Sequence, residues 1–299
     1  MSRSRRSFSG GLVACLFVLL TQDARAGANP AWTTPIAPFQ ISGNLYYVGS
    51  RDLAAYLIVT PLGDILLNSN LEQSVPQIRR SVEQLGFRFG DIKILLISHA
   101  HFDHAAGSAA VKRLTGAKYM VMDADVPVVE SGGGTDFAYG SESGYVPAKV
   151  DRVLHDGDAV QLGGTVLVAH KTPGHTRGCT TWTMQVADHG RPRNVVIVGS
   201  WNVNPGFRLV DTPKRKASYP GIAADFEHTF AVLGSLPCDL FLGAHGIYFN
   251  MLEKLARRPP GSPGDAKVWI DPVGYRTAVL ERAAAFHAEL RRQQDDAER

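Results

Sequence analysis

The sequence predicts an α/β fold, an αββα sandwich in which two mixed β-sheets pack face to face with helices on their outer faces. Two observations predict it. Strand-like and helix-like segments follow in the order strands, helix, strands, then strands, helix, strand, helix. Several histidines also come directly after strand-like runs, and α/β sheets present functional groups at the carboxyl ends of strands. The site is therefore expected at one edge of the sheets.

Residues 1–26 have the features of an export leader. Arginines within residues 3–6 precede an apolar run over residues 10–20, which is too short to span a membrane as a helix. Residues 24–26 read Ala-Arg-Ala, a small-residue cleavage site, so we expect a cleaved, periplasmic protein. The arginine pair fits either the ordinary secretory route or the twin-arginine route.

The first half of the remaining chain predicts a sheet with helices on it. A proline-rich, irregular arm over residues 27–43 comes first, and Gly86 ends the first helix. The predicted elements are strands over 44–49, 54–60 and 64–68, a helix over 75–85, a buried strand over 92–97, a helix that continues through 111–114 and a strand over 118–122.

The second half begins after a stretch rich in glycine and serine, residues 131–145, which also carries Phe137, Tyr139 and Tyr145. This composition predicts a mobile loop over the edge of the site. The elements that follow are strands over 159–162, 166–169, 180–186 and 194–198, a helix over 223–233, a strand over 240–242 and a terminal helix over 275–292.

Charge argues against a nucleic-acid partner. The whole chain has 31 Lys and Arg against 28 Asp and Glu, but residues 1–26 hold four Arg and one Asp, which leaves 27 of each sign. A neutral domain has no electrostatic footprint for nucleic acid. We expect a monomer without nucleic-acid partner or stable membrane association. Cys179 and Cys238 could form a disulfide after export, but nothing in the sequence brings them together, so two buried thiols are expected.

The most informative run is His99-Ala100-His101-Phe102-Asp103-His104, directly after a strand-like segment. Neutral imidazole and carboxylate are the usual ligands of catalytic zinc. His99 and His101 are two residues apart and point the same way in extended backbone, whereas the adjacent Asp103 and His104 diverge. One metal can therefore take the histidine pair, and a second can take the Asp-His pair.

Two further histidines follow strand-like runs. His175 lies in the turn Thr172-Pro173-Gly174-His175-Thr176, and His245 follows the apolar run at 240–242. Beside the motif above, both are predicted to be metal ligands. The remaining histidines of the mature chain have no partner pattern and are expected to be structural or solvated: His155, His170, His189, His228 and His287.

From about residue 44 onward, this pattern resembles the metallo-β-lactamase superfamily. Four segments look like those of its subclass B3, namely residues 172–182, 219–222, 226–230 and 242–245. The resemblance implies the αββα fold and two zinc ions per chain. It implies that the first zinc is bound by His99, His101 and His175, and the second by Asp103, His104 and His245.

Ser200, after the strand at 194–198, distinguishes among the branches of the superfamily that the chain could resemble. Other hydrolytic branches of the superfamily usually place a metal-bridging Asp here and the B1 β-lactamases a Cys, whereas the B3 group has Ser. Serine is too weak a ligand to replace either. Residues 201–207 depart from the commoner B3 pattern, which is richer in Ser and Thr. Ser200 and Asn202 are predicted to contact substrate or water.

The resemblance implies hydrolysis of the β-lactam ring of penicillins, cephalosporins and carbapenems by a zinc-bound hydroxide. Zinc lowers the pKa of bound water to about 7, and Asp103 is the predicted catalytic residue that orients the nucleophile. Two alternatives stay open. One is a lactonase or other ester hydrolase of the same superfamily, and the other is a non-catalytic zinc-binding relative.

Overall fold

The computed structural model describes residues 29–259 and 266–298, so the predicted leader lies outside the described residues. The described residues from Ala31 onward form one compact unit. Within the described part of the chain, no helix combines the length and apolar character needed to cross a bilayer.

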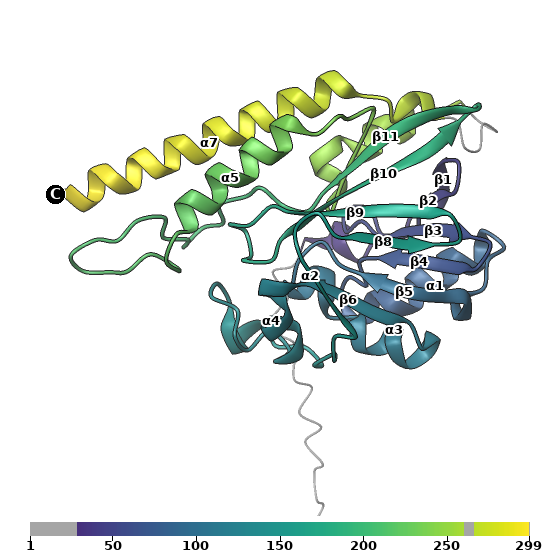
Figure 1. Cartoon of the computed structure of the whole chain (residues 1–299), viewed down its shortest axis with the longest axis horizontal. Coiled ribbons are helices and arrows are strands. Elements are labelled where there is room, and N and C mark those ends of the chain that lie inside the picture. The colour runs from purple at the N-terminus through teal and green to yellow at the C-terminus, as the bar shows by residue number, and fades with distance from the viewer. Residues whose placement is uncertain (1–28, 260–265, 299) are drawn as a thin grey trace, which may run out of the picture. The chain divides into compact units, whose positions relative to one another are not determined.

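Two sheets lie face to face between two layers of helices (Figure 1). The first sheet has the strand order β1-β2-β3-β4-β5-β6-β7, and the second has the order β12-β11-β10-β9-β8. Helices α1 and α3 lie on the outer side of the first sheet, and α5 and α7 lie on the outer side of the second (Figure 1). Both sheets contain parallel and antiparallel pairs. The predicted αββα sandwich is therefore confirmed.

The strands of the first sheet are β1 (Phe39–Ser42), β2 (Leu45–Tyr47), β3 (Tyr56–Thr60), β4 (Gly63–Leu67), β5 (Ile92–Leu96), β6 (Lys118–Met122) and β7 (Arg152–Leu154). Those of the second are β8 (Ala159–Leu162), β9 (Thr165–Lys171), β10 (Thr180–Asp188), β11 (Arg191–Val198) and β12 (Leu240–Gly243). The α-helices are α1 (Val75–Gln84), α2 (Phe102–Ala105), α3 (Ser108–Thr115), α4 (Val126–Glu130), α5 (Ile222–Ser235), α6 (Met251–Ala256) and α7 (Pro272–Glu298).

The prediction of an irregular arm over 27–43 is wrong at its end, because β1 pairs antiparallel with β2 there. Strand β7 and helices α4 and α6 were also not predicted. Each of these elements has three to six residues. Segments this short contain too few repeats of a 2- or 3.6-residue period to be read from hydrophobic pattern alone.

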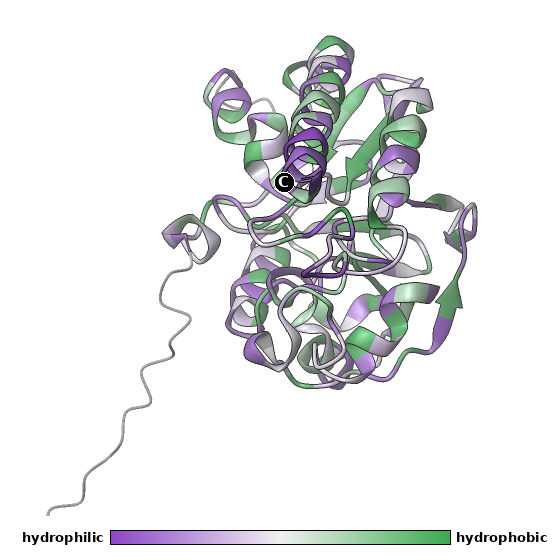
Figure 2. Cartoon of the chain, turned by 90° about the vertical axis from the view of Figure 1, so that its left-hand side faces the viewer, coloured by the Kyte–Doolittle hydropathy of each residue, from purple (hydrophilic) through white to green (hydrophobic). Residues whose placement is uncertain are grey.

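Successive side chains of the central strands point to opposite faces, so the first sheet contributes to two hydrophobic cores. Ile65 and Leu67 of β4 belong to the core between the sheets, whereas Leu66 between them belongs to the core under α1 and α3. This is the two-residue period of a strand buried on both faces. Figure 2 shows hydrophobic strands lying between helices that also carry hydrophilic residues.

Hydrogen bonds join the two sheets at the edge where the histidines lie. The Trp182 indole of β10 donates to the carbonyl of Ile97 at 3.0 Å, and the Tyr56 hydroxyl of β3 donates to the carbonyl of Gly243 at 2.7 Å. The Thr180 N–H donates to the carbonyl of Ser98 at 2.7 Å. These bonds hold the carboxyl ends of β5 and β12 close to the start of β10, so the residues that follow β5 and β12 converge with the turn that precedes β10.

Candidate metal centre

The first three predicted ligands meet in one cluster. His99 and His101 follow β5, and His175 comes from the turn between β9 and β10. His101 Nδ1 and His175 Nε2 lie 3.1 Å apart, and the His99 ring centroid is 4.8 Å from that of His175. All three side chains are buried, and one ligand atom of each lies within 4.8 Å of the other two.

The second trio forms an adjacent triangle. His104 Nε2 and His245 Nε2 are 3.1 Å apart, and Asp103 Oδ2 lies 3.3 Å from the first nitrogen and 3.5 Å from the second. The His99 and His104 rings are 4.3 Å apart between centroids, so the two trios share a border. The structure thus brings all six predicted ligand residues together.

Local backbone structure explains why the motif can serve both trios. His101 is extended and immediately precedes the one-turn helix α2, which contains Asp103 and His104. The change from strand to helix directs these two side chains to a position of their own beside the first trio, with His99 bordering both. On the facing turn, Gly174 has φ +124°, and a Cβ there would lie 2.8 Å from the Phe226 ring. Only glycine fits this position before His175.

Asp52 orients His245 from behind and was not predicted. Its Oδ2 accepts hydrogen bonds from His245 Nδ1 at 3.0 Å and from the Trp32 indole at 3.1 Å. Its Oδ1 accepts the Ile247 N–H at 3.1 Å. A carboxylate behind a histidine fixes which ring nitrogen faces the metal. No local signal marks Asp52, because its contact with His245 spans 193 residues of sequence.

Asp125 ties the two ligand-bearing loops together and was also missed. Its carboxylate accepts hydrogen bonds, each 2.8 Å long, from the Ala100 N–H, the Thr176 hydroxyl and the Gly178 N–H. Burial raises the pKa of Asp125 to about 6 in spite of these bonds. Asp125 lies three residues after the end of the apolar strand β6, and this place near a strand end is the one signal that could have marked it.

The loop over residues 131–145 lies against the centre, as the sequence predicts. The Tyr139 ring is 4.9 Å from the His101 ring, and the Asp136 carboxylate is 3.4 Å from His101 Nε2. The Tyr145 hydroxyl donates to the carbonyl of Ala100 at 2.7 Å. Whether this loop moves stays a prediction.

The two predicted substrate contacts share one partner. Ser200 Oγ lies 3.1 Å from the Tyr248 hydroxyl, and the Asn202 amide donates to the same hydroxyl at 3.0 Å. Ser200 is buried and Asn202 is half-buried. The Asn202 carbonyl accepts the Nδ1 proton of His175 at 2.8 Å, so this loop also orients a ligand. A groove of about 640 Å³ between this loop and α7 is lined in part by Asn202, Tyr248 and Arg282.

Burial and charge set the protonation of the two trios. Burial lowers the pKa values of His99 and His101 well below the usual range and that of His175 to about 4. Burial opposes ionisation of Asp103 as well, but the charges and hydrogen bonds of His104 and His245 outweigh it and hold the Asp103 pKa well below its usual range. The imidazoles of the first trio are therefore neutral at pH 7 and offer lone pairs, as metal ligation requires.

The other histidines and the cysteines take no part in the centre. His170 bonds the Thr183 hydroxyl at 2.8 Å, and His287 pairs with Glu227 at 3.0 Å. Cys179 and Cys238 are free thiols, as expected, but only Cys179 is fully buried.

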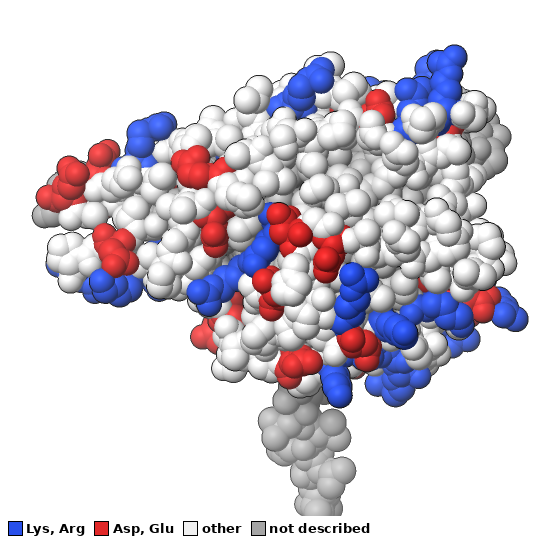
Figure 3. Space-filling model, viewed as in Figure 1, with Lys and Arg blue, Asp and Glu red and all other residues white. Residues whose placement is uncertain are grey.

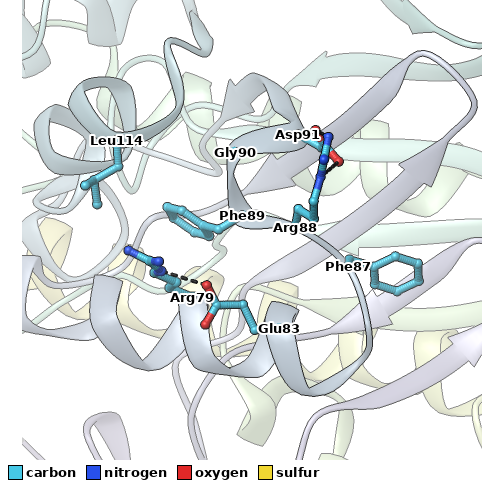
Figure 4. Close-up of a pocket in the computed structure, with 8 residues that line it drawn as sticks. All are labelled: Arg79, Glu83, Phe87, Arg88, Phe89, Gly90, Asp91 and Leu114. Carbon is cyan, nitrogen blue, oxygen red and sulfur yellow. Dashed lines mark hydrogen bonds and ion pairs between the residues drawn. The ribbon is translucent and has the colours of Figure 1, made fainter.

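A separate hollow lies on the first sheet's helical side, between α1, α3 and the 3-10 helix η3 (Phe89–Asp91) (Figure 4). Arg79 pairs with Glu83 and Arg88 with Asp91, both at 2.8 Å. Neighbouring carboxylates thus already balance both arginines, and no metal ligand lines the hollow. It does not compete with the histidine cluster as a functional site.

The donor set fits zinc. Ligands at 2.0–2.1 Å from a tetrahedral zinc lie roughly 3.3 Å apart. The facing nitrogens and oxygens of the two trios are separated by 3.1–3.5 Å. Neutral imidazoles whose nitrogens face each other at this spacing, together with one ionised carboxylate, are the ligand types that zinc takes. An αββα sandwich with these residues at one edge defines a metal-dependent hydrolase.

Comparison with known proteins identifies the family. The profile of the metallo-β-lactamase superfamily matches residues 54–188. FEZ-1 metallo-β-lactamase from Legionella gormanii is 53% identical in sequence with a TM-score of 0.83, and the match covers 87% of this chain and 98% of FEZ-1. The chain belongs to the metallo-β-lactamase superfamily, and it is a zinc hydrolase.

Two further solved relatives are described as subclass B3 enzymes. BJP-1 of Bradyrhizobium japonicum is 36% identical with a TM-score of 0.81, and the match covers 89% of this chain and 98% of BJP-1. LRA-12, a di-zinc enzyme from an Alaskan soil metagenome, is 36% identical with a TM-score of 0.79, and the match covers 87% and 97% of the two chains. The resemblance to subclass B3 is confirmed.

Curated relatives match over shorter stretches. A probable metallo-hydrolase of Burkholderia pseudomallei is 32% identical over 114 residues, 38% of this chain and 37% of the relative. A hydroxyacylglutathione hydrolase of Methylobacterium sp. (strain 4-46) is 29% identical over 108 residues, 36% of this chain and 35% of the relative. The chain thus spans little more than a third of the length of these relatives.

Proposed function

We propose that this protein hydrolyses the β-lactam ring of antibiotics, namely penicillins, cephalosporins and carbapenems, with two bound zinc ions. The observation that carries the proposal is the pair of adjoining ligand trios, His99/His101/His175 and Asp103/His104/His245, with Ser200 where other branches place a metal ligand. The similarity to the metallo-β-lactamases FEZ-1 and BJP-1 and to the di-zinc enzyme LRA-12 supports it.

When bound, the zinc ions supply a hydroxide nucleophile at neutral pH and polarise the carbonyl of the substrate. The chain's own residues orient these parts. Asp103 stays ionised, and its carboxylate can accept the proton of the attacking nucleophile in a hydrogen bond, which directs the lone pair at the carbonyl carbon. Asp52, through His245, and the Asn202 carbonyl, through His175, hold the ligand rings in place. Strain in the four-membered ring favours cleavage of the C–N bond.

Ser200 and Asn202 are our proposed substrate contacts. Asn202 is the more accessible of the two, and its amide and the Tyr248 hydroxyl can turn toward an anionic substrate group. Ser200, which is buried, holds the Tyr248 hydroxyl from the other side. The groove beside α7 gives room for the substituents of a small-molecule substrate.

Substrate and metal dependence test the proposal together. The purified full-length protein is given a chromogenic cephalosporin, an acyl-homoserine lactone and S-lactoylglutathione, the last because of the hydroxyacylglutathione hydrolases among its relatives. We expect turnover of the cephalosporin, loss of it with EDTA and recovery with zinc. Clavulanate, which traps nucleophilic serines, should not inhibit. Faster turnover of the lactone or thioester, or activity that survives exhaustive chelation, would overturn the assignment.

A further inference from the structure

The loop over residues 131–145 places a buried carboxylate behind a metal ligand. Asp136 Oδ2 lies 3.4 Å from His101 Nε2, and only 6% of the Asp136 side chain and 3% of the His101 side chain are exposed. His101 Nε2 has no hydrogen-bond partner among the described residues, apart from this ion-pair contact. The opposite ring nitrogen, Nδ1, faces His175 inside the first trio.

We propose that Asp136 is a positioning residue that holds His101 in the tautomer protonated at Nε2. The lone pair of Nδ1 then points at the first metal position. The inference rests on the proposed zinc site but not on the identity of the substrate.

The loop itself holds Asp136 in place. Asp136 Oδ1 accepts the Ala138 N–H at 3.2 Å, so the carboxylate closes the turn in which it lies, and Oδ2 is left to face His101. Tyr139, three residues further on, packs its ring against that of His101, and its hydroxyl accepts the Asn204 amide at 2.8 Å. The turn thus holds the carboxylate, and Tyr139 holds the same loop against the His101 ring.

The chemistry requires an acceptor at this position. A histidine binds metal through one nitrogen, and a hydrogen bond from its other nitrogen sets the tautomer and the ring orientation. Loss of such a partner typically weakens metal binding 10–100-fold. For the other trio, Asp52 stands in the same relation to His245. Each metal position would then have one carboxylate-backed histidine.

The Asp136→Asn variant separates this role from closure of the turn. Its amide oxygen can still accept the Ala138 N–H, but the NH2 group then faces His101 Nε2. A donor there favours the tautomer protonated at Nδ1, which cannot bind metal. Asp136→Ala loses the turn closure but presents no donor to His101, so water can take the Nε2 proton.

The two variants should therefore rank in opposite orders for zinc affinity and for thermal stability. Zinc dissociation constants from chelator competition should show the first site weakened about 10–100-fold in Asp136→Asn, and less in Asp136→Ala, with the second site close to the parent. Melting of the metal-free proteins should show the larger loss in Asp136→Ala. Glu142→Gln, which removes an exposed carboxylate from the same loop, is the matched control and should leave both measurements unchanged.

Three results would count against the inference. Parental zinc affinity in Asp136→Asn would overturn it. The inference would also be overturned if Asp136→Ala showed the larger loss in both zinc affinity and melting temperature, because that ranking means that Asp136 only closes its turn. A parent chain that binds no zinc would overturn the zinc assignment and this inference with it. Zinc binding without β-lactam turnover would instead overturn the proposed substrate and leave Asp136 in its role.

Discussion

Side chains only a few residues apart in the motif differ in charge, because some are neutral and one is ionised. Burial keeps His99 and His101 neutral, whereas the imidazoles of His104 and His245 hold the Asp103 carboxylate ionised. In the same way, hydrogen bonds from Asp103 and Asp52 outweigh the burial of His245 and raise its pKa to about 9. In the metal-free protein the second trio therefore contains a charged pair, and zinc must displace the His245 proton to bind.

Asp103→Asn should reduce catalysis far more than stability. The amide is neutral and a poor zinc ligand, and it nearly preserves the volume of the carboxylate. Loss of nucleophile orientation alone can cost on the order of a hundredfold in rate, and weaker binding of the second zinc adds to that. Steady-state rates at saturating zinc, beside a melting curve, measure both effects. A rate within about threefold of the parent would make Asp103 structural and the proposed mechanism wrong.

The two metal positions should be separable by single substitutions. His101→Ala should mainly weaken the first zinc and His245→Ala the second, because each removes one of three protein ligands. Native mass spectrometry counts the bound ions. His228→Ala, which removes an exposed histidine of α5, should keep both. Two tight zinc ions in His245→Ala would remove His245 from the ligand set.

At the scale of residues, sequence patterns predict ligands better than the residues that support them. All six predicted ligand residues meet in the structure, because their identity and their place after strands carry the chemistry. Asp52, Asp125 and Asp136 were not predicted. Their partners lie 193, 25 to 53 and 35 residues away in the chain, and only Asp125, shortly after β6, has a local signal.

At the scale of elements, length decided what could be predicted. The central strands were predicted to within three residues at their boundaries, because each shows several repeats of its period. The terminal helix was also predicted, but it begins three residues earlier and ends six residues later than expected. The short edge strands β1 and β7 were not, because hydrogen bonds to a neighbouring strand define them rather than their own pattern.

Helix α7 does more than cover the second sheet. Gln293, near its end, accepts the Leu209 N–H at 2.7 Å and donates to the Phe207 carbonyl at 2.8 Å. These residues belong to the same segment as Asn202, whose carbonyl orients His175. The helix thus holds the loop that carries a proposed substrate contact.

Gln293→Ala should loosen this loop. Two backbone groups lose their partners, and each lost hydrogen bond costs about 1 kcal/mol of stability. Trypsin should then cut faster at the exposed Arg208 and at the basic run over residues 214–216, and the KM for a cephalosporin should rise more than kcat falls. The neighbouring Gln294→Ala, which removes an exposed glutamine, is the control. Equal cleavage rates in both variants would show that the hydrogen bonds of Gln293 do not hold the loop.

At the scale of the whole molecule, positive and negative side chains of the described residues are mixed over the surface and do not form a patch of one sign. On the face shown in Figure 3, Lys and Arg lie interspersed with Asp and Glu. This agrees with the equal number of each sign after residue 26 and with a small-molecule substrate rather than a polyanion. The charges that bear on stability are instead the few that the fold buries.

Asp64, at the start of β4 and far from the metal ligands in the fold, is one of these. Only 4% of the residue is exposed, and its carboxylate accepts a hydrogen bond from the Thr60 N–H at 3.4 Å. Burial, assisted by the nearby Asp91, raises its pKa to about 6. In the unfolded chain an aspartate titrates near 3.9. The folded state therefore binds this proton more tightly, and the stability that Asp64 contributes is fully present below about pH 4 and is lost as the pH rises through about 6.

Asp64→Asn should remove that dependence, because the amide mimics the protonated acid at every pH. Urea unfolding of the metal-free protein between pH 4.5 and 7.5 measures it, with EDTA present so that zinc does not contribute. The variant should be more stable than the parent at pH 7.5, and the two should converge as the pH falls toward 4.5. Glu72→Gln, which removes an exposed carboxylate before α1, should run parallel to the parent across the range. A difference in unfolding free energy between Asp64→Asn and the parent that stays constant with pH would contradict the prediction. It would mean that Asp64 is ionised in the folded protein across this range, because water reaches its carboxylate past residues 60–64.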